Sequence, residues 1–139
     1  MKLKKIWVKL FAISMLISSF YTTAGAQTVV NELVCEYHTN PIGIDVQKPR
    51  LSWKIVSDKQ NVLQSAYEIK VTDQSPKGKV IWNSGKIASD QSVNVEFAGP
   101  ELKSMQRVYW QVRIWDNENK GTKWSEPAFW EMGILKPEL

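Results

Sequence analysis

The sequence predicts an all-β fold, a sandwich of seven antiparallel strands arranged in two sheets. Three observations support this prediction. Apolar and polar residues alternate with a period of two in short segments along the chain. Stretches rich in turn-forming residues separate these segments at nearly regular spacing. No segment has the apolar periodicity of an α-helix.

The N-terminal stretch has the pattern of a signal peptide. Four lysines, the last of them Lys9, precede the apolar run LFAISMLISSF, and the small-x-small tripeptide Ala24-Gly25-Ala26 follows it. The run is shorter than the roughly 20 residues of a membrane span. We therefore predict a signal peptide over residues 1–26, with export to the periplasm or the cell exterior. The mature chain would have no further contact with the membrane. The alternative is an uncleaved anchor.

Charge and cysteine content exclude several classes of function. The formal net charge of +4 is accounted for by the four lysines of the predicted leader, which contains no acid. The remainder is formally neutral, so the sequence predicts no nucleic-acid partner. A single cysteine, Cys35, excludes an internal disulfide framework and any multi-cysteine metal site. We expect Cys35 to be a small buried hydrophobe, and we predict no cofactor and no metal.

The residues after the predicted leader suffice for one domain with a single core. We predict an N-terminal lead-in over 27–32, a β-sandwich over 33–135, and the start of a truncated linker over 136–139.

The first two predicted strands flank a turn-rich stretch. LVCEY at 33–37 is the first strand, and HTNPIGID at 38–45 contains the turn signals Asn40-Pro41 and Gly43. RLSWKIV at 50–56 alternates apolar residues with serine and lysine, as a half-buried strand does.

Three further strands follow in order. SAYEIKVT at 65–72 alternates Tyr, Ile and Val with Glu, Lys and Thr. KVIWNS at 79–84 comes after the loop DQSPKGK and is terminated by Gly85. SVNVEF at 92–97 alternates Val, Val and Phe with polar residues. Each has the composition and period of a short strand.

The last two predicted strands are VYWQVRIW at 108–115 and WSEPAFWEM at 124–132. In the first, one face of the strand is purely apolar and must meet the opposite sheet. Tryptophans on inward positions should therefore fill the core rather than bind a ligand. The predicted core residues are Trp53, Tyr67, Trp110, Val112, Ile114 and Trp130, together with Val108.

The other face of 108–115 is mixed aromatic and charged. Pairing of 65–72 beside 108–115 would gather outward side chains of both strands on one sheet face, and Glu68 could form an ion pair with Arg113. Such a face suits a contact between domains, although exposed tryptophans could instead stack against sugar rings. The candidate contact residues are Trp115, Tyr109, Arg113, Trp82 and Trp124.

No catalytic constellation can be assembled from the sequence. The single histidine, His38, stands in a turn, and no Ser-His-Asp or Cys-His set is evident. Glycoside hydrolysis requires two carboxyl groups about 5–10 Å apart, but the acids are scattered singly. Asp116 and Glu118 lie in DNENKG, where we expect solvated side chains that support the turn. We predict no catalytic residue.

The ordered motifs resemble those of a known family. CEY, NPIGID and PRLSW are followed by QSAYEIKV, IWNSGKI, YWQVRIWD and WSEPAFWEMGIL across about residues 31 to 135. This succession resembles the N-terminal fibronectin type III-like domain of bacterial α-L-rhamnosidases, the family 78 glycoside hydrolases. The resemblance implies an immunoglobulin-like sandwich. One departure concerns the corner tyrosine of fibronectin domains, because its expected position, counted from Leu102, is occupied by Val108.

The resemblance also implies that catalysis and the accessory role belong to different domains. In that family further β-sandwich domains and an (α/α)6 barrel follow this module, and the barrel contains the acids that release rhamnose. No barrel follows in this sequence. The expectation is thus a non-catalytic accessory module of an exported rhamnoside-degrading system, not itself an enzyme. Its expected partners are the downstream domains, in cis or in trans, and rhamnose-containing glycans are a further candidate.

Two other functions remain open from the sequence. The chain could be a stand-alone carbohydrate-binding module that uses Trp115, Trp82 or Trp124 as stacking platforms. It could also be a protein-interaction or adhesion domain that dimerises through the face of residues 109–115.

Overall fold

The computed structural model describes residue 25 and residues 27–136, and these form eight strands and no helix. The predicted signal peptide therefore lies outside the described residues except for Gly25, as do residues 137–139 of the predicted linker. No described segment is a helix long and apolar enough to cross a membrane. The strands are β1 (Thr28–Cys35), β2 (Ile42–Ile44), β3 (Arg50–Ser57), β4 (Gln64–Asp73), β5 (Val80–Asn83), β6 (Val95–Glu96), β7 (Arg107–Asp116) and β8 (Ala128–Met132).

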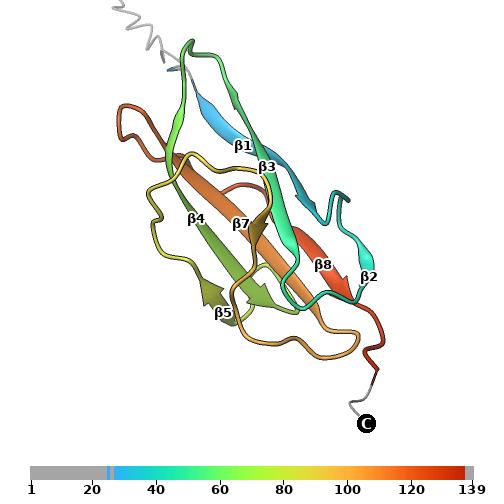
Figure 1. Ribbon diagram of the computed structural model, residues 1–139. Coiled ribbons are helices and arrows are strands. Elements are labelled where there is room, and N and C mark those ends of the chain that lie inside the picture. The colour runs from blue at the N-terminus through green and yellow to red at the C-terminus, as the bar shows by residue number, and fades with distance from the viewer. Residues whose placement is uncertain (1–24, 26, 137–139) are drawn as a thin grey trace, which may run out of the picture.

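The strands form two sheets that face each other (Figure 1). One sheet has three strands in the order β1-β3-β6, and the other has five in the order β2-β8-β7-β4-β5. The predicted all-β sandwich is confirmed. The strand count is eight rather than seven, and one pair, β2 with β8, is parallel while the others are antiparallel.

The additional strand, β2, lies where the sequence predicts only a turn. Asn40 has a positive φ of 48° and makes the reversal, and its side-chain oxygen accepts a hydrogen bond of 2.9 Å from the Phe129 amide. The chain then runs beside β8, where the Gly133 amide donates to the Ile44 carbonyl at 2.7 Å. The turn-forming residues lead directly into β2. Because β2 has only three residues, it is too short to show an alternation of apolar and polar side chains.

The first strand begins at Thr28, five residues before the predicted 33–37. A bulge between Asn31 and Val34 places one extra residue in this strand, and Glu32 there has a φ of 47°. Val30, Leu33 and Cys35 are consequently the buried positions. Their spacing breaks the period of two, which explains why the sequence pattern conceals the start of the strand. The predicted lead-in is part of the sandwich.

Aromatic rings fill the space between the sheets. The Trp110 and Trp130 ring centroids are 6.5 Å apart, and Trp130 meets Phe97 edge-on at 5.2 Å. Trp53 of the smaller sheet contacts Tyr67 of the larger one at 5.3 Å. The predicted core residues are all buried: Trp53, Tyr67, Val108, Trp110, Val112, Ile114 and Trp130.

Packing outweighs hydrogen bonding for two of these rings. The indole N–H groups of Trp110 and Trp130 have no hydrogen-bond partner among the described residues. A missing partner costs about 1–3 kcal/mol. Burying roughly 200 Å² of ring at about 25 cal/mol per Å² contributes about 5 kcal/mol. At both positions the free energy gained by burying the ring therefore exceeds the cost of the missing hydrogen bond.

A buried amide links the sheets at the third tryptophan. The Trp53 indole N–H donates to Gln64 Oε1 at 3.0 Å. The Gln64 amide nitrogen in turn donates to the carbonyls of Ser89 and Gln91, at 3.0 and 2.8 Å. Gln64 is buried at the start of β4. Because every polar atom of this group has a partner, the contact fixes both the ring and the loop that crosses it.

Cys35 is buried at the end of β1, as the sequence predicts. Burial, with a smaller effect of the neighbouring Glu36 charge, raises the pKa of its thiol to about 12. The thiol is thus held in its neutral form at ordinary pH.

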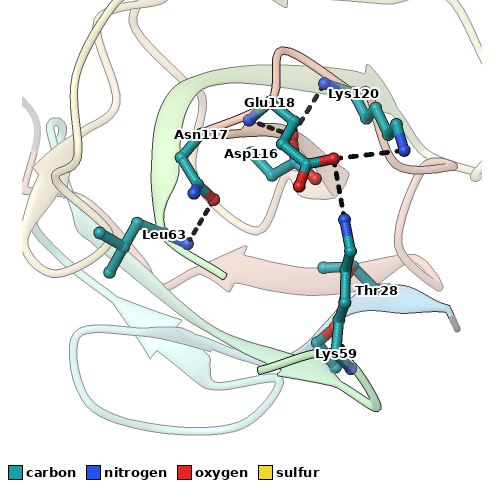
Figure 2. Close-up of polar contacts among 8 residues, drawn as sticks. Thr28, Lys59, Leu63, Asp116, Asn117, Glu118 and Lys120 are labelled. Atoms are coloured by element: carbon teal, nitrogen blue, oxygen red, sulfur yellow. Dashed lines mark hydrogen bonds and ion pairs between the residues drawn. The ribbon is translucent and has the colours of Figure 1, made fainter. Parts of the chain in front are cut away.

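The loop after β7 is built around Asp116 (Figure 2). Its Oδ1 accepts hydrogen bonds of 2.9 Å from the amides of both Lys120 and Glu118. These bonds, that of Lys120 first, lower the pKa of the Asp116 carboxyl despite its burial. The prediction that Asp116 supports the turn is confirmed, but the expectation that it is solvated is wrong, because it is only 5% exposed.

The same loop is tied to the connection between β3 and β4, residues 58–63, which runs from one sheet to the other. Glu118 accepts from Lys59 Nζ at 2.8 Å and lies 3.3 Å from Lys120 Nζ. The Leu63 amide donates to the Asn117 side chain at 3.1 Å (Figure 2). The acids of DNENKG thus serve to hold two turns together.

Trp110→Ala should lower the free energy of unfolding by about 3–5 kcal/mol, because a buried indole is replaced by a cavity. Urea titration followed by circular dichroism measures the loss. Leu63→Ala is the control, since Leu63 is 67% exposed and its truncation should change stability by no more than about 0.5 kcal/mol. Equal losses for the two variants would contradict the assignment of Trp110 to the core.

Asp116→Asn should destabilise the domain in a pH-dependent way. The lowered pKa means that the carboxylate stabilises the folded state fully above its ordinary pKa of about 3.9, and loses this effect as pH falls through the lower folded value. The melting temperature of the variant should therefore lie below that of the wild type at neutral pH, and the two should converge in acid. Thermal unfolding between about pH 7 and pH 2 tests this; a gap that stays constant over the range rules it out.

Candidate functional site

The strongest concentration of the predicted contact residues lies on the outer face of the five-stranded sheet. β4 pairs with β7 in antiparallel register, as predicted, with Glu68 opposite Arg113 and Lys70 opposite Gln111. Side chains of alternate residues in the two strands therefore point away from the core together.

An ion pair anchors the centre of this face. Both Nε and Nη2 of Arg113 lie 2.6 Å from Glu68 Oε2, so the predicted pair is present. Glu68 is only 8% exposed. A carboxylate this buried needs a partner, and the guanidinium satisfies it with charge-assisted hydrogen bonds. The orientation of Arg113 is thereby fixed.

Cations lie over the two tryptophans of this face. The Arg113 Cζ atom is 5.1 Å from the Trp115 ring centroid and 4.6 Å from that of Trp124. Lys86 Nζ is 4.5 Å from the Trp115 centroid, and Lys70 Nζ is 4.6 Å from that of Trp124. We call these five residues the cation–aromatic face. Each contact contributes about 0.5–1 kcal/mol at such a half-exposed site.

Trp124 reaches this face through two hydroxyl groups that the sequence analysis did not single out. The Ile114 amide donates to Thr122 Oγ1 at 3.1 Å, and the Val112 amide donates to Ser125 Oγ at 3.0 Å. The segment 121–125 thus follows β7 by a mixed pairing, in which its backbone amides donate to β7 carbonyls while its hydroxyl groups replace backbone acceptors for the β7 amides. The predicted strand over 124–132 is accordingly shorter, and β8 begins at Ala128.

A second aromatic group continues the same sheet face toward β8. Tyr109 and Phe129 are paired across the strands with ring centroids 5.7 Å apart. The Arg107 guanidinium lies 4.2 Å from the Phe129 centroid, and its Nε donates to Glu131 at 2.8 Å. Here too a cation covers the ring and an acid holds the cation.

Trp82 does not lie on the cation–aromatic face. It pairs with Val71, a buried residue of β4, and its ring meets Phe97 edge-on at 5.2 Å. A register shift between β4 and β5 accompanies this placement. Trp82 therefore belongs with the partly buried residues packed around the core.

Two grooves cross the surface of the described residues. One, of about 430 Å³, is lined by Asp116, whose carboxylate is already bonded within its loop, and by Lys59, Lys120 and Lys123. The other, of about 390 Å³, contains two acids, Glu32 and Glu126. Neither groove is lined by Trp53 or Trp110.

The second groove brings two carboxyl groups to one cleft. Glu32 is exposed and its carboxylate forms an ion pair of 2.5 Å with Lys54. Glu126 is also exposed. A glycosidase acid is kept protonated near neutral pH by a dry, apolar environment, and neither residue has one. The groove therefore lacks the paired environments that hydrolysis requires.

Metal and nucleophile chemistry find no support in the part of the chain that the structure describes. No group of three His, Cys, Asp or Glu side chains there could hold a metal ion. His38 is exposed, and its Nδ1 lies 2.7 Å from the Glu36 carbonyl oxygen, so it closes its own turn. Cys35 pairs with His38 through two backbone hydrogen bonds, but the Cys35 side chain is buried while that of His38 is exposed.

Comparison with known proteins gives the family. A model of Rha78A-like N-terminal immunoglobulin domains matches residues 30–136. The chain is 41% identical over 102 residues to an α-L-rhamnosidase of Streptomyces avermitilis, which covers 72% of this chain and 10% of that protein.

Solved structures agree. The crystal structure of the Streptomyces avermitilis α-L-rhamnosidase complexed with L-rhamnose matches with a TM-score of 0.72 and 39% identity, over 76% of this chain and 10% of that one. The α-L-rhamnosidase from Dictyoglumus thermophilum matches with a TM-score of 0.73 and 30% identity, over 78% of this chain and 13% of that one. The chain spans about a tenth of the length of the curated relatives it matches. The resemblance seen in the motifs is confirmed, and the chain belongs to the Rha78A-like N-terminal immunoglobulin domain family.

Proposed function

We propose that this chain is a non-catalytic structural module of an exported α-L-rhamnosidase system, and that hydrolysis is carried out by other domains. The relatives it matches are α-L-rhamnosidases, and it corresponds to about a tenth of their length, at the N-terminal end by the name of the family. Fold alone does not define activity, so the proposal depends on how the acids of this domain are used.

The observation that carries the proposal is the engagement of the carboxylates. Glu68, Glu131 and Glu36 are each bound to an arginine, while Glu118 and Glu32 are bound to lysines. Asp116 is bound to backbone amides. Acids committed in this way stabilise strands and turns. An acid–base pair needs instead two carboxyls whose pKa values are driven apart across a substrate cleft.

The fold is compatible with cleavage of a signal peptide after Ala26, which remains a proposal. Gln27 would then be the first residue of the mature chain, and β1 begins at the next residue, Thr28. Removal of residues 1–26 would leave all the strands of the described residues intact.

Sugar stacking on the tryptophans is less well supported. A pyranose stacks on an aromatic face, and the faces of Trp115 and Trp124 already have cations over them. A sugar would have to displace Arg113, which Glu68 holds in place, or one of the two lysines. The cation–aromatic face is therefore better suited to stabilising the sheet than to binding a glycan.

The chain without residues 1–26 should not hydrolyse an aryl α-L-rhamnoside above the rate in buffer, because no pair of acids among the described residues is arranged for the reaction. Release of the aryl group followed by absorbance measures this, with the Streptomyces avermitilis α-L-rhamnosidase as positive control. Measurable turnover by this domain that disappears in Glu32→Gln/Glu126→Gln would refute the proposal and locate the site in the second groove.

Titration with L-rhamnose should leave the tryptophan fluorescence unchanged, because the two outer rings are covered by cations. Arg113→Ala is the informative comparison, since it uncovers parts of both Trp115 and Trp124. A saturable change in the wild type that Trp115→Ala abolishes would favour a carbohydrate-binding module instead.

A further inference from the structure

The most exposed large apolar side chains gather at one end of the sandwich. Ile134 is 84% exposed, and Ile42 and Met105 are each 67% exposed. Leu63 is equally exposed but lies in the β3–β4 connection, directly before β4, and its amide is bonded to the loop after β7. We call Ile42, Met105 and Ile134 the exit-end surface, because the chain leaves the sandwich there (Figure 1).

Backbone hydrogen bonds hold the three segments of this surface together. The Met105 amide donates to the Gly133 carbonyl at 3.1 Å, and the Gly133 amide donates to the Ile44 carbonyl at 2.7 Å. The Leu135 amide donates to Ser104 Oγ at 2.9 Å. The exposed side chains are therefore carried on a fixed platform, so docking there would require little ordering of the backbone.

Met105 is held in an uncommon conformation. Its φ of 61° lies in the left-handed region, which is unfavourable for a residue with a long side chain. Strain of this kind persists where the surrounding structure imposes it, and here the bond to Gly133 does so. Beside the apolar side chains, the Arg107–Glu131 pair supplies charge, because Glu131 is the register partner of Ile42. An apolar centre with a polar rim is the usual composition of a protein interface.

The position of this surface indicates its occupant. Residues 133–135 follow β8 directly and form part of it. The family is N-terminal in its relatives, so the other nine-tenths or so of those proteins continue from this end. A following domain would begin next to Ile134.

The cation–aromatic face is less suited than the exit-end surface to contact a following domain. None of its rings is among the highly exposed large hydrophobic residues, and its cations are already engaged with rings or with Glu68. Covering it would remove charges from water with few apolar atoms left to bury, whereas the exit-end surface has exposed apolar area.

We propose that the exit-end surface is the docking site for the α-L-rhamnosidase region that follows this domain, through an apolar patch on that region. This inference rests on the proposed function and adds to it the face by which the module acts. The predicted contact through the outer sheet face is thereby reassigned to the end of the sandwich.

A chimera tests the proposal. Residues 30–136 replace the matching segment of the Streptomyces avermitilis α-L-rhamnosidase, and thermal unfolding and aryl rhamnoside turnover are measured. Ile42→Glu/Ile134→Glu should lower the melting temperature of the chimera by more than about 5 °C, yet shift that of the isolated domain by less than about 2 °C. Leu63→Glu/Val93→Glu is the matched control, since both residues are exposed and lie away from the exit, and it should leave the chimera within about 2 °C.

Each other outcome overturns the inference. Equal shifts for the two double variants mean that the exit-end surface has no special contact. A chimera that fails to fold, under conditions in which the Streptomyces enzyme folds, means that the surface does not fit the following region. Neither result concerns the proposed lack of activity, which is decided separately by the turnover of the isolated domain.

Discussion

The pairing of β4 with β7 is the constraint on which the rest of this structure depends. Their register sets the two strands side by side along almost their whole length at the centre of the larger sheet. Because successive side chains of a strand point to opposite faces, this pairing determines both which side chains face the core and which lie on the outer face of the sheet. Trp110 and its neighbours are directed at the smaller sheet, and Arg113 is directed outward over Glu68. A shift of one residue would exchange the two sets.

The two surfaces of the domain differ in how completely their interactions are satisfied within the domain. On the outer sheet face, aromatic rings, cations and buried acids satisfy one another, so the face is stable against water without a partner. At the end where the chain leaves, backbone hydrogen bonds join the segments while apolar side chains stay in solvent. The residues of the outer sheet face therefore stabilise the domain itself, whereas those of the exit-end surface are available for contact with another domain.

The sequence predicts this fold well wherever one alternation governs a strand. β3, β4 and β7, the ion pair of Glu68 with Arg113, and the buried tryptophans all follow from a period of two. The prediction from sequence fails where the strand pairing is irregular. The bulge at Glu32 conceals the start of β1, and a register shift accompanies the inward placement of Trp82. The position of Trp124 depends on hydroxyl groups that substitute for backbone acceptors, and no periodicity reports such bonds.

The burial of Cys35 limits the reactivity of its thiol. Disulfide exchange proceeds through the thiolate, and a thiol with a pKa of about 12 supplies almost none at neutral pH. Its sulfur is also shielded by the core that surrounds it. Folded copies of the domain can therefore be concentrated without cross-linking through Cys35. A cysteine introduced at the surface would react with thiol labels, while Cys35 would not.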